Sequence, residues 1–343
     1  MNMPSMYVNP GSSLYDGLRD ALHQPPALID LNASLVDSNL PADQLINNNL
    51  TTMYRQVVSG GTTPTLFLGS PYRAGDPPAP GAGTFELVPH NNIHSWTGDR
   101  TQPNMEDMGS SYSAARDPIF FAHHSNVDRI WPIWKSLGGN RKDFTDPDFL
   151  NAGFVFYDEK KQLVRVTVKD CLEQENLRYK YQDVEIPWLQ ATPKAPTGKK
   201  IDKKAVGTTE YPISLDKTVQ VLVKRPVTKK RSKKEKEDKE EMLIISGIKL
   251  NRGAPVKFDV FINYDGKVGL DSCACAGSFT NVPHAHGVDK GNTITTCLKL
   301  GITRLLEDLE AEDDNDIVVI MVPSENTMEQ VVTIDGIEIQ FDN

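Results

Sequence analysis

The chain has 343 residues, of which 38% are hydrophobic, with 24 Gly and 23 Pro. This composition is typical of a loop-rich globular protein with room for two or three domains. A formal net charge of −9 argues against a general nucleic-acid-binding protein. No run of eighteen apolar residues occurs, so we expect no membrane span. Four cysteines are too few for a disulfide framework.

The first part of the chain, residues 1–80, is rich in Pro, Gly, Asn and Ser. It contains one pattern that predicts a helix, from Pro41 to about Gly60, although Asn and Thr residues interrupt the pattern. The next predicted helix covers residues 84–97 and carries His90 and His94. Side chains four residues apart share one face of a helix, so both imidazoles can meet one ion. Copper, zinc, iron and nickel all bind imidazole, so the residues leave the metal open. The alternative to a metal site is a pair of surface histidines on a loop.

A second helix that could carry a ligand is predicted for residues 117–137. Asp117 can cap its N-terminus, and Pro118 suits the first helical position because proline has no N–H to leave unpaired. Spacings of four and three residues put one stripe on a single face: Phe120, His124, Val127, Trp131 and Trp134. A histidine in such an apolar stripe needs a partner for its buried nitrogen. Gly138-Gly139 then ends the helix.

The chain changes character after residue 140. Residues 154–168 predict a hairpin with a polar turn. Tyr179 and Tyr181 follow, and we expect both hydroxyls to find structural partners. Residues 190–208 are polar and contain proline, as is typical of a linker. From residue 209 onward the pattern predicts strands with one helix, Thr303–Glu310, which together indicate a β-sandwich.

The predicted strands of this last part are Thr218–Val223, Met242–Ile245, Val256–Tyr264, Asp316–Val322 and Gln330–Phe341. Between them, residues 229–241 alternate lysines with acids, which predicts a solvated loop rather than a polyanion site. His284 and His286 alternate like strand residues near Cys273 and Cys275. One hypothesis is a second metal site there; the other, which we expect, is a loop.

Three motifs together resemble the plant polyphenol oxidase family (catechol oxidase or tyrosinase). They are His90-x-x-x-His94, then Arg-Asp-Pro-Ile-Phe-Phe-Ala-His-His-Ser-Asn-Val-Asp-Arg at residues 116–129, and Ala-Gly-Ser-Phe-Thr-Asn-Val-Pro-His at residues 276–284. The resemblance runs through almost the whole chain. It implies a mainly α-helical, tyrosinase-like copper-binding domain, here incomplete, followed by a C-terminal β-sandwich that shields the site.

The resemblance also implies the domain limits. Residues 1–140 form the C-terminal half of the catalytic domain with the copper B helices, and residues 141–189 form the end of that domain. Residues 190–208 form a linker at which a processing protease cuts, and residues 209–343 form the β-rich shielding domain. The family is plastid-targeted, to the thylakoid lumen. We see no transit peptide at Met1-Asn2-Met3-Pro4.

The implied copper B ligands are His90, His94 and His124, with His123 making a hydrogen bond beside them. The family's dicopper centre also has three copper A histidines, which the resemblance places upstream of residue 1. Glu86 lies where the family holds a water near the coppers, and Asn91 where a residue helps that water to accept a proton. Glu86 could instead be an acid at a helix start.

The function implied is oxidation of o-diphenols to o-quinones with O₂ at a dicopper centre of which this chain supplies copper B. We expect at most about one copper per chain and no catechol turnover by the chain alone. One alternative is a catalytically inactive relative. A reversible O₂ carrier, as in haemocyanins, is the other, and the plant-like C-terminal motifs argue against it.

Overall fold

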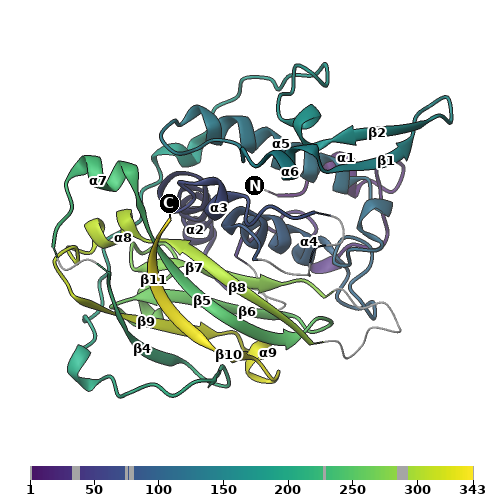
Figure 1. Ribbon diagram of the computed structural model, residues 1–343. Helices are drawn as coiled ribbons and strands as arrows, with labels where there is room; N and C mark the ends of the chain where they lie inside the picture. The colour runs from purple at the N-terminus through teal and green to yellow at the C-terminus, as the bar shows by residue number, and fades with distance from the viewer. Residues whose placement is uncertain are drawn as a thin grey trace.

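The computed structural model describes residues 2–32, 39–73, 76, 81–226, 229–283 and 293–342. In these residues a helical part, built from the first half of the chain, lies above two β-sheets (Figure 1). Its α-helices are α1 (Ser5–Val8), α2 (Ala42–Tyr54), α3 (Pro64–Phe67), α4 (Asn91–Thr97), α5 (Ile119–Ser136) and α6 (Pro147–Asn151). Two π-helical turns extend this framework, Arg55–Ser59 after α2 and Glu86–His90 before α4.

Short 3₁₀ turns connect the other elements of the chain. They are Ala21–His23, Ala114–Arg116, Val168–Cys171, Pro187–Gln190, Lys203–Ala205 and Gly266–Val268. The helix predicted from Pro41 to about Gly60 is confirmed, because α2 and its π-helical turn together cover it. Both helices that were predicted to carry ligands are also present as α4 and α5.

The core of the helical part forms around α5. Trp134 is fully buried, and its indole ring stacks on Phe67 with ring centroids 4.6 Å apart. Its Nε1–H donates to the carbonyl oxygen of Gly61. At the other end of α5, the carboxylate of Asp117 accepts the backbone N–H of Ile119 at 2.8 Å, as a residue that caps a helix start should. The helix that carries His123 and His124 is thus fixed at both ends.

Two sheets build the C-terminal part. In one sheet the strand order is β11-β5-β10-β3, with β8 also paired to β5, and in the other it is β4-β9-β6-β7. The strands are β3 (Ile213–Ser214), β4 (Val219–Lys224), β5 (Glu240–Asn251), β6 (Val256–Ile262), β7 (Cys275–Asn281), β8 (Thr293–Gly301), β9 (Asp316–Pro323), β10 (Thr333–Ile334) and β11 (Gly336–Asp342). Their apolar side chains form one shared core between the sheets. The predicted β-sandwich and the mainly helical part before it are therefore confirmed.

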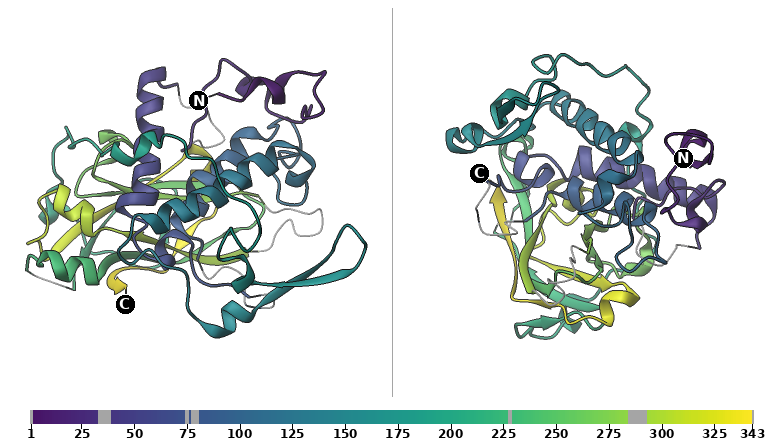
Figure 2. Two further views of the ribbon diagram at one scale, coloured as in Figure 1. Left: turned by 90° about the horizontal axis from the view of Figure 1, so that it is seen from above. Right: turned by 90° about the vertical axis from the view of Figure 1, so that its right-hand side faces the viewer.

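The predicted hairpin is also present, as β1 (Gly153–Tyr157) and β2 (Leu163–Thr167), paired from Gly153 with Thr167 to Tyr157 with Leu163. It projects from the helical part (Figures 1 and 2). Its apolar side chains are largely exposed.

Three strands were not predicted from the sequence: β3, β7 and β8. β7 is rich in small residues and buried on both faces, so it shows no alternation of apolar and polar residues. The prediction of one helix in this part is wrong, because α7 (Lys233–Asp238) and α9 (Glu325–Met328) accompany α8 (Thr303–Asp308). α7 lies in the segment predicted to be a solvated loop. It forms because Ser232 and Glu235 make a reciprocal capping box at its start.

The segment predicted to be a linker, residues 190–208, runs along the sheet part. The N–H of Lys194 donates to the carbonyl oxygen of Asp271 at 2.8 Å, and the N–H of Ile201 donates to that of Asn263 at 2.8 Å. Most of its side chains are exposed. None of the helices described here is both long and apolar enough to cross a membrane.

Candidate metal centre

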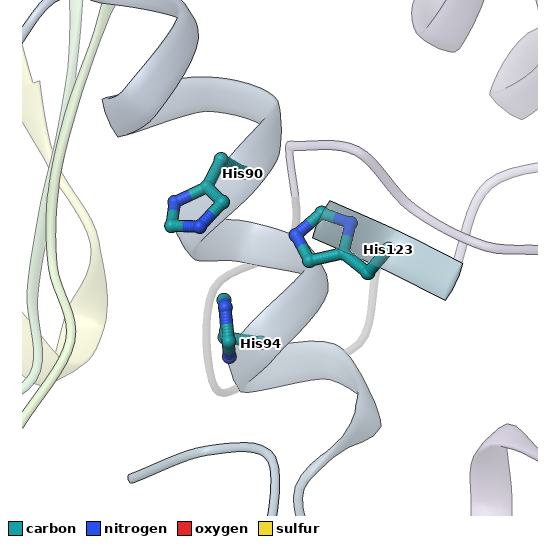
Figure 3. A group of neighbouring side chains, drawn as sticks. All are labelled: His90, His94 and His123. Carbon is teal, nitrogen blue, oxygen red and sulfur yellow. The ribbon is translucent and has the colours of Figure 1, made fainter. Parts of the chain in front are cut away.

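Two of the candidate ligands come from consecutive turns of one helical segment. His90 ends the π-helical turn and His94 lies in the following helix α4, with ring centroids 4.8 Å apart. His94 is buried and His90 is half-buried. Figure 3 shows both rings on the same side of this segment. The prediction that one helix face presents both imidazoles is therefore confirmed as geometry.

Helix α5 brings two further histidines to the same place. The ring of His123 lies 5.1 Å from that of His90 and 5.2 Å from that of His94, and the ring of His124 lies at the same two distances. His90, His94 and His123 each offer a ligand atom within 4.8 Å of the others (Figure 3). His124, which the sequence favoured as third ligand, has its Nε2 atom 3.1 Å from Nε2 of His90. The structure thus gathers four imidazoles: the three predicted ligands and His123, which was expected beside them.

Hydrogen bonds orient three of these rings in the same way. Nδ1 of His94 donates to the carbonyl oxygen of Met108 at 2.8 Å, and Nδ1 of His124 donates to that of Phe120 at 2.8 Å. Nδ1 of His90 donates to Oδ1 of Asn91 at 3.0 Å. A neutral imidazole that donates through Nδ1 keeps an unprotonated Nε2, which is the form that binds metals.

The nitrogen positions fit a bound cation. Nε2 of His90 and Nε2 of His124 face each other at 3.1 Å, although both are acceptors when Nδ1 carries the proton. Two such atoms repel unless a cation lies against both. Nε2 of His123 is buried and has no hydrogen-bond partner among the described residues. Metal–nitrogen bonds of about 2.0–2.1 Å place two ligand nitrogens no more than about 4.2 Å apart, so the His90–His124 spacing is compatible with one ion.

Burial favours the neutral form of His90, His94 and His123. Desolvation lowers the pKa of His90 to about 4 and that of His94 to about 4, and lowers the pKa of His123 to about 2. The neighbouring histidines add to this effect, because a second positive charge nearby is unfavourable. At neutral pH these three imidazoles are therefore uncharged, and each keeps one ring nitrogen with a lone pair for a metal ion.

Glu86 and Asn91 lie on the same segment as His90. Both line a cleft of about 400 Å³ between the helical part and the sheets. Solvent reaches the side chain of Glu86, yet the surrounding atoms still desolvate its carboxyl and raise its pKa. The amide oxygen of Asn91 holds the His90 ring. Their predicted role toward a water stays a prediction.

Three other residues that could have had a chemical role, Tyr179, Tyr181 and His23, have structural partners instead. Tyr179 and Tyr181 both donate their hydroxyls to Oδ2 of Asp128 on α5, as expected for residues that stabilise packing. The ring of His23 stacks on Trp96, away from the four histidines, with centroids 4.4 Å apart. The hypothesis of a second metal site at His284 and His286 lies outside the described residues.

The sequence missed two contributors to this centre, the carbonyl oxygens of Met108 and Phe120 that accept from His94 and His124. The place of His123 beside the ligands was expected. A backbone carbonyl leaves no trace in the sequence, and Met108 meets His94 only because the loop after α4 folds back.

The helical frame with clustered histidines, covered by two sheets, defines a protein of the tyrosinase fold with a candidate histidine metal site. Family models match along the chain: the common central domain of tyrosinase at residues 13–137, the polyphenol oxidase middle domain at residues 143–194, and the chloroplastic polyphenol oxidase C-terminal domain at residues 211–341. The structure of latent apple tyrosinase superposes with a TM-score of 0.92 at 52% identity, covering 100% of this chain and 74% of that one. That of latent aurone synthase from natural source gives a TM-score of 0.90 at 37% identity, with 99% and 68% covered.

Curated relatives agree with this class. The chain is 52% identical to a chloroplastic polyphenol oxidase of Malus domestica, with 99% of this chain and 60% of the relative covered. It is 48% identical to an aureusidin synthase of Antirrhinum majus, with 100% and 63% covered. The chain belongs to the plant polyphenol oxidase family, within the tyrosinases. It spans about 60% of the length of the Malus relative.

Proposed function

We propose that this chain is the copper B-bearing part of a polyphenol oxidase that oxidises o-diphenols to o-quinones with O₂. The observation that carries the proposal is the convergence of four imidazoles, two of them with Nε2 atoms facing each other at 3.1 Å. Such a donor set suits copper, and membership of the tyrosinase family favours copper over the other metals that bind imidazole. Copper, when bound, supplies the redox chemistry.

His90, His94 and His124 would hold the ion. His124 is favoured as third ligand because its Nδ1–H is engaged with a backbone carbonyl and its Nε2 faces that of His90. His123 is the competing candidate, since its Nε2 is buried without a partner among the described residues and it groups with His90 and His94. Replacing each by alanine separates the two: loss of His124 should abolish copper binding, whereas loss of His123 should only weaken it.

Glu86 and Asn91 would act on the substrate side. Glu86 lines the cleft together with Asn91, and burial raises the pKa of its carboxyl, which can therefore share a proton with a bound water. Asn91 holds the His90 ring through its amide oxygen, which leaves its amide N–H groups to face that water. The pair would orient the water that accepts a proton from the phenol. The cleft walls include apolar side chains that can pack on an aromatic ring, among them Leu68, Leu87 and Val282.

The substrate class and the location also form part of the proposal. Several relatives carry the name polyphenol oxidase, while others are named aureusidin synthase or (+)-larreatricin hydroxylase, so the phenol can differ between members. We assign o-diphenols as the class. Relatives named chloroplastic favour a plastid location, and we place the protein in the thylakoid lumen. A processing protease would cut at residues 190–208, whose side chains are mostly exposed.

A second candidate is a relative that binds one copper without catalysis. It is favoured by the position of His23, whose ring nitrogens contact the carbonyl oxygen of Trp96 and the guanidinium of Arg100 rather than the histidine cluster. Within the described residues, the metal-binding side chains that gather with ligand atoms within 4.8 Å of one another are those of His90, His94 and His123.

Two experiments test the proposal. Copper titration of the chain should saturate at about one ion per chain, and His94→Ala should bind none at the same concentration; equal binding by both proteins refutes the site.

The second experiment joins the chain to that part of the Malus polyphenol oxidase which it does not match. Oxygen uptake with catechol by this chimera supports the oxidase, and a copper-loaded but inactive chimera favours the second candidate.

A further inference from the structure

Residues 18–20 cross the end of the helix that carries His94. Arg19 forms an antiparallel bridge with Gly98, which directly follows α4. Beside it, the backbone N–H of Asp20 donates to the carbonyl oxygen of Thr97 at 3.1 Å. This short strap, defined as residues 18–20, is therefore fixed to the C-terminal end of α4.

The strap also holds the loop that orients His94. The backbone N–H of Asp107 donates to the carbonyl oxygen of Leu18 at 3.1 Å. The next residue in this loop is Met108, whose carbonyl oxygen accepts Nδ1–H of His94 at 2.8 Å. The hydrogen bond that sets the tautomer and direction of this imidazole thus depends on a loop anchored by the strap.

The side chain of Arg19 reaches the second ligand helix. Its Nε donates to Oδ2 of Asp117 at 2.8 Å and its Nη2 donates to Oδ1 at 2.6 Å, in a two-pronged ion pair. The two side chains are only 1% and 0% exposed. Asp117 also accepts the N–H of Ile119, so the same carboxylate fixes the start of α5. One residue therefore connects the end of α4 with the beginning of α5.

We propose that Arg19 is a positioning residue for the metal centre, which sets the distance between the His90–His94 pair, on α4 and the turn before it, and the histidine pair on α5. The inference rests on the proposed metal site. Arg19 contacts none of these histidines, so it acts through the two helices. Its planar fork matters more than its charge, because only a guanidinium can hold both carboxylate oxygens in one fixed plane.

The chain offers a matched control for this inference. Arg225 makes an equivalent buried, two-pronged ion pair with Glu241 in the sheet part, at 3.0 and 2.8 Å, with both side chains 2% exposed. Arg225→Lys therefore perturbs a similar ion pair that has no connection with α4 or α5. Arg19→Lys keeps the charge and removes the fork.

The test measures the dissociation constant for Cu²⁺ by competition with a chelator, together with the EPR spectrum of the bound ion and the melting temperature of each apo-protein. Arg19→Lys should weaken Cu²⁺ binding about tenfold and change the EPR parameters, since groups that orient metal ligands typically contribute factors of this size. Arg225→Lys should lower the melting temperature and leave both metal readouts unchanged.

Several outcomes overturn the inference. Arg19→Lys with wild-type affinity and spectrum refutes it, and so does an equal loss of affinity in Arg225→Lys. If Arg19→Lys does not fold, the same measurements are made on Asp117→Asn, with the same expected and refuting results. In that variant Arg19 keeps its hydrogen bonds to the carbonyl oxygens of Tyr7 and Leu14. A wild-type chain that binds no Cu²⁺ instead refutes the metal site itself, which separates the two failures.

Discussion

Glu240 joins the helical part to the sheet part, and its protonation should make that junction pH-dependent. It is the first residue of β5 and is 6% exposed. One carboxyl oxygen accepts from the hydroxyl of Thr62 at 3.0 Å, and the other accepts from the backbone N–H of Thr303 at 2.9 Å. The charged groups that face it are the guanidinium groups of Arg231 and Arg141.

Burial raises the pKa of Glu240 from its ordinary 4.5 to about 7 despite these contacts. Between these pH values the folded protein holds a proton on this carboxyl that the unfolded chain has lost. Stability from this group is therefore complete below pH 4.5 and falls as the pH rises toward 7. The whole change amounts to about 3 kcal/mol, as an order of magnitude.

Glu240→Gln removes the titration while keeping a side chain that can bond to Thr62 and Thr303. We expect this variant to match wild type in urea unfolding at about pH 5 and to be more stable by roughly 1–3 kcal/mol at about pH 8. Glu338→Gln, at an exposed position on β11, is the control and should leave the pH profile unchanged. A Glu240→Gln profile parallel to that of wild type over this range would refute the reasoning.

Three further predictions concern the helical part. Trp134→Ala should cost about 3–5 kcal/mol of unfolding free energy because the ring is fully buried, while Phe154→Ala on the exposed hairpin should cost less than about 1 kcal/mol, both measured by urea unfolding. Asp128→Asn should lower the pKa of Tyr179 from about 12 toward 10, which ultraviolet titration of the tyrosines can follow. Metal removal by a chelator should lower the melting temperature of the copper-loaded wild type and leave that of His94→Ala unchanged.

Helix α5 shows how far local pattern carries a prediction. Its start at Asp117-Pro118 and its apolar stripe are properties of neighbouring residues, so the sequence alone predicts the helix and its buried Trp134. The same pattern does not decide between His123 and His124. These are adjacent in the chain, and their rings lie equally far from those of His90 and His94 in the folded protein.

The C-terminal part shows where local pattern fails. Strands β4, β6 and β9 were predicted because they are rich in β-branched and aromatic residues. β7 was not, because its small residues acquire strand structure only by pairing with β6. α7 was missed because a dense run of charges hid its capping box.

The sequence by itself determined the chemistry that this protein can offer: a histidine pair one helical turn apart, a further histidine pair on a second helix, and a sheet part after them. These features depend on residues close together in the chain. Only the tertiary structure decided how the pairs meet. Met108 orients His94, and Arg19 joins the end of α4 to the start of α5 by pairing with Asp117, 98 positions away in the sequence. Contacts of such separation depend on the packing of the whole chain, and no local periodicity encodes them.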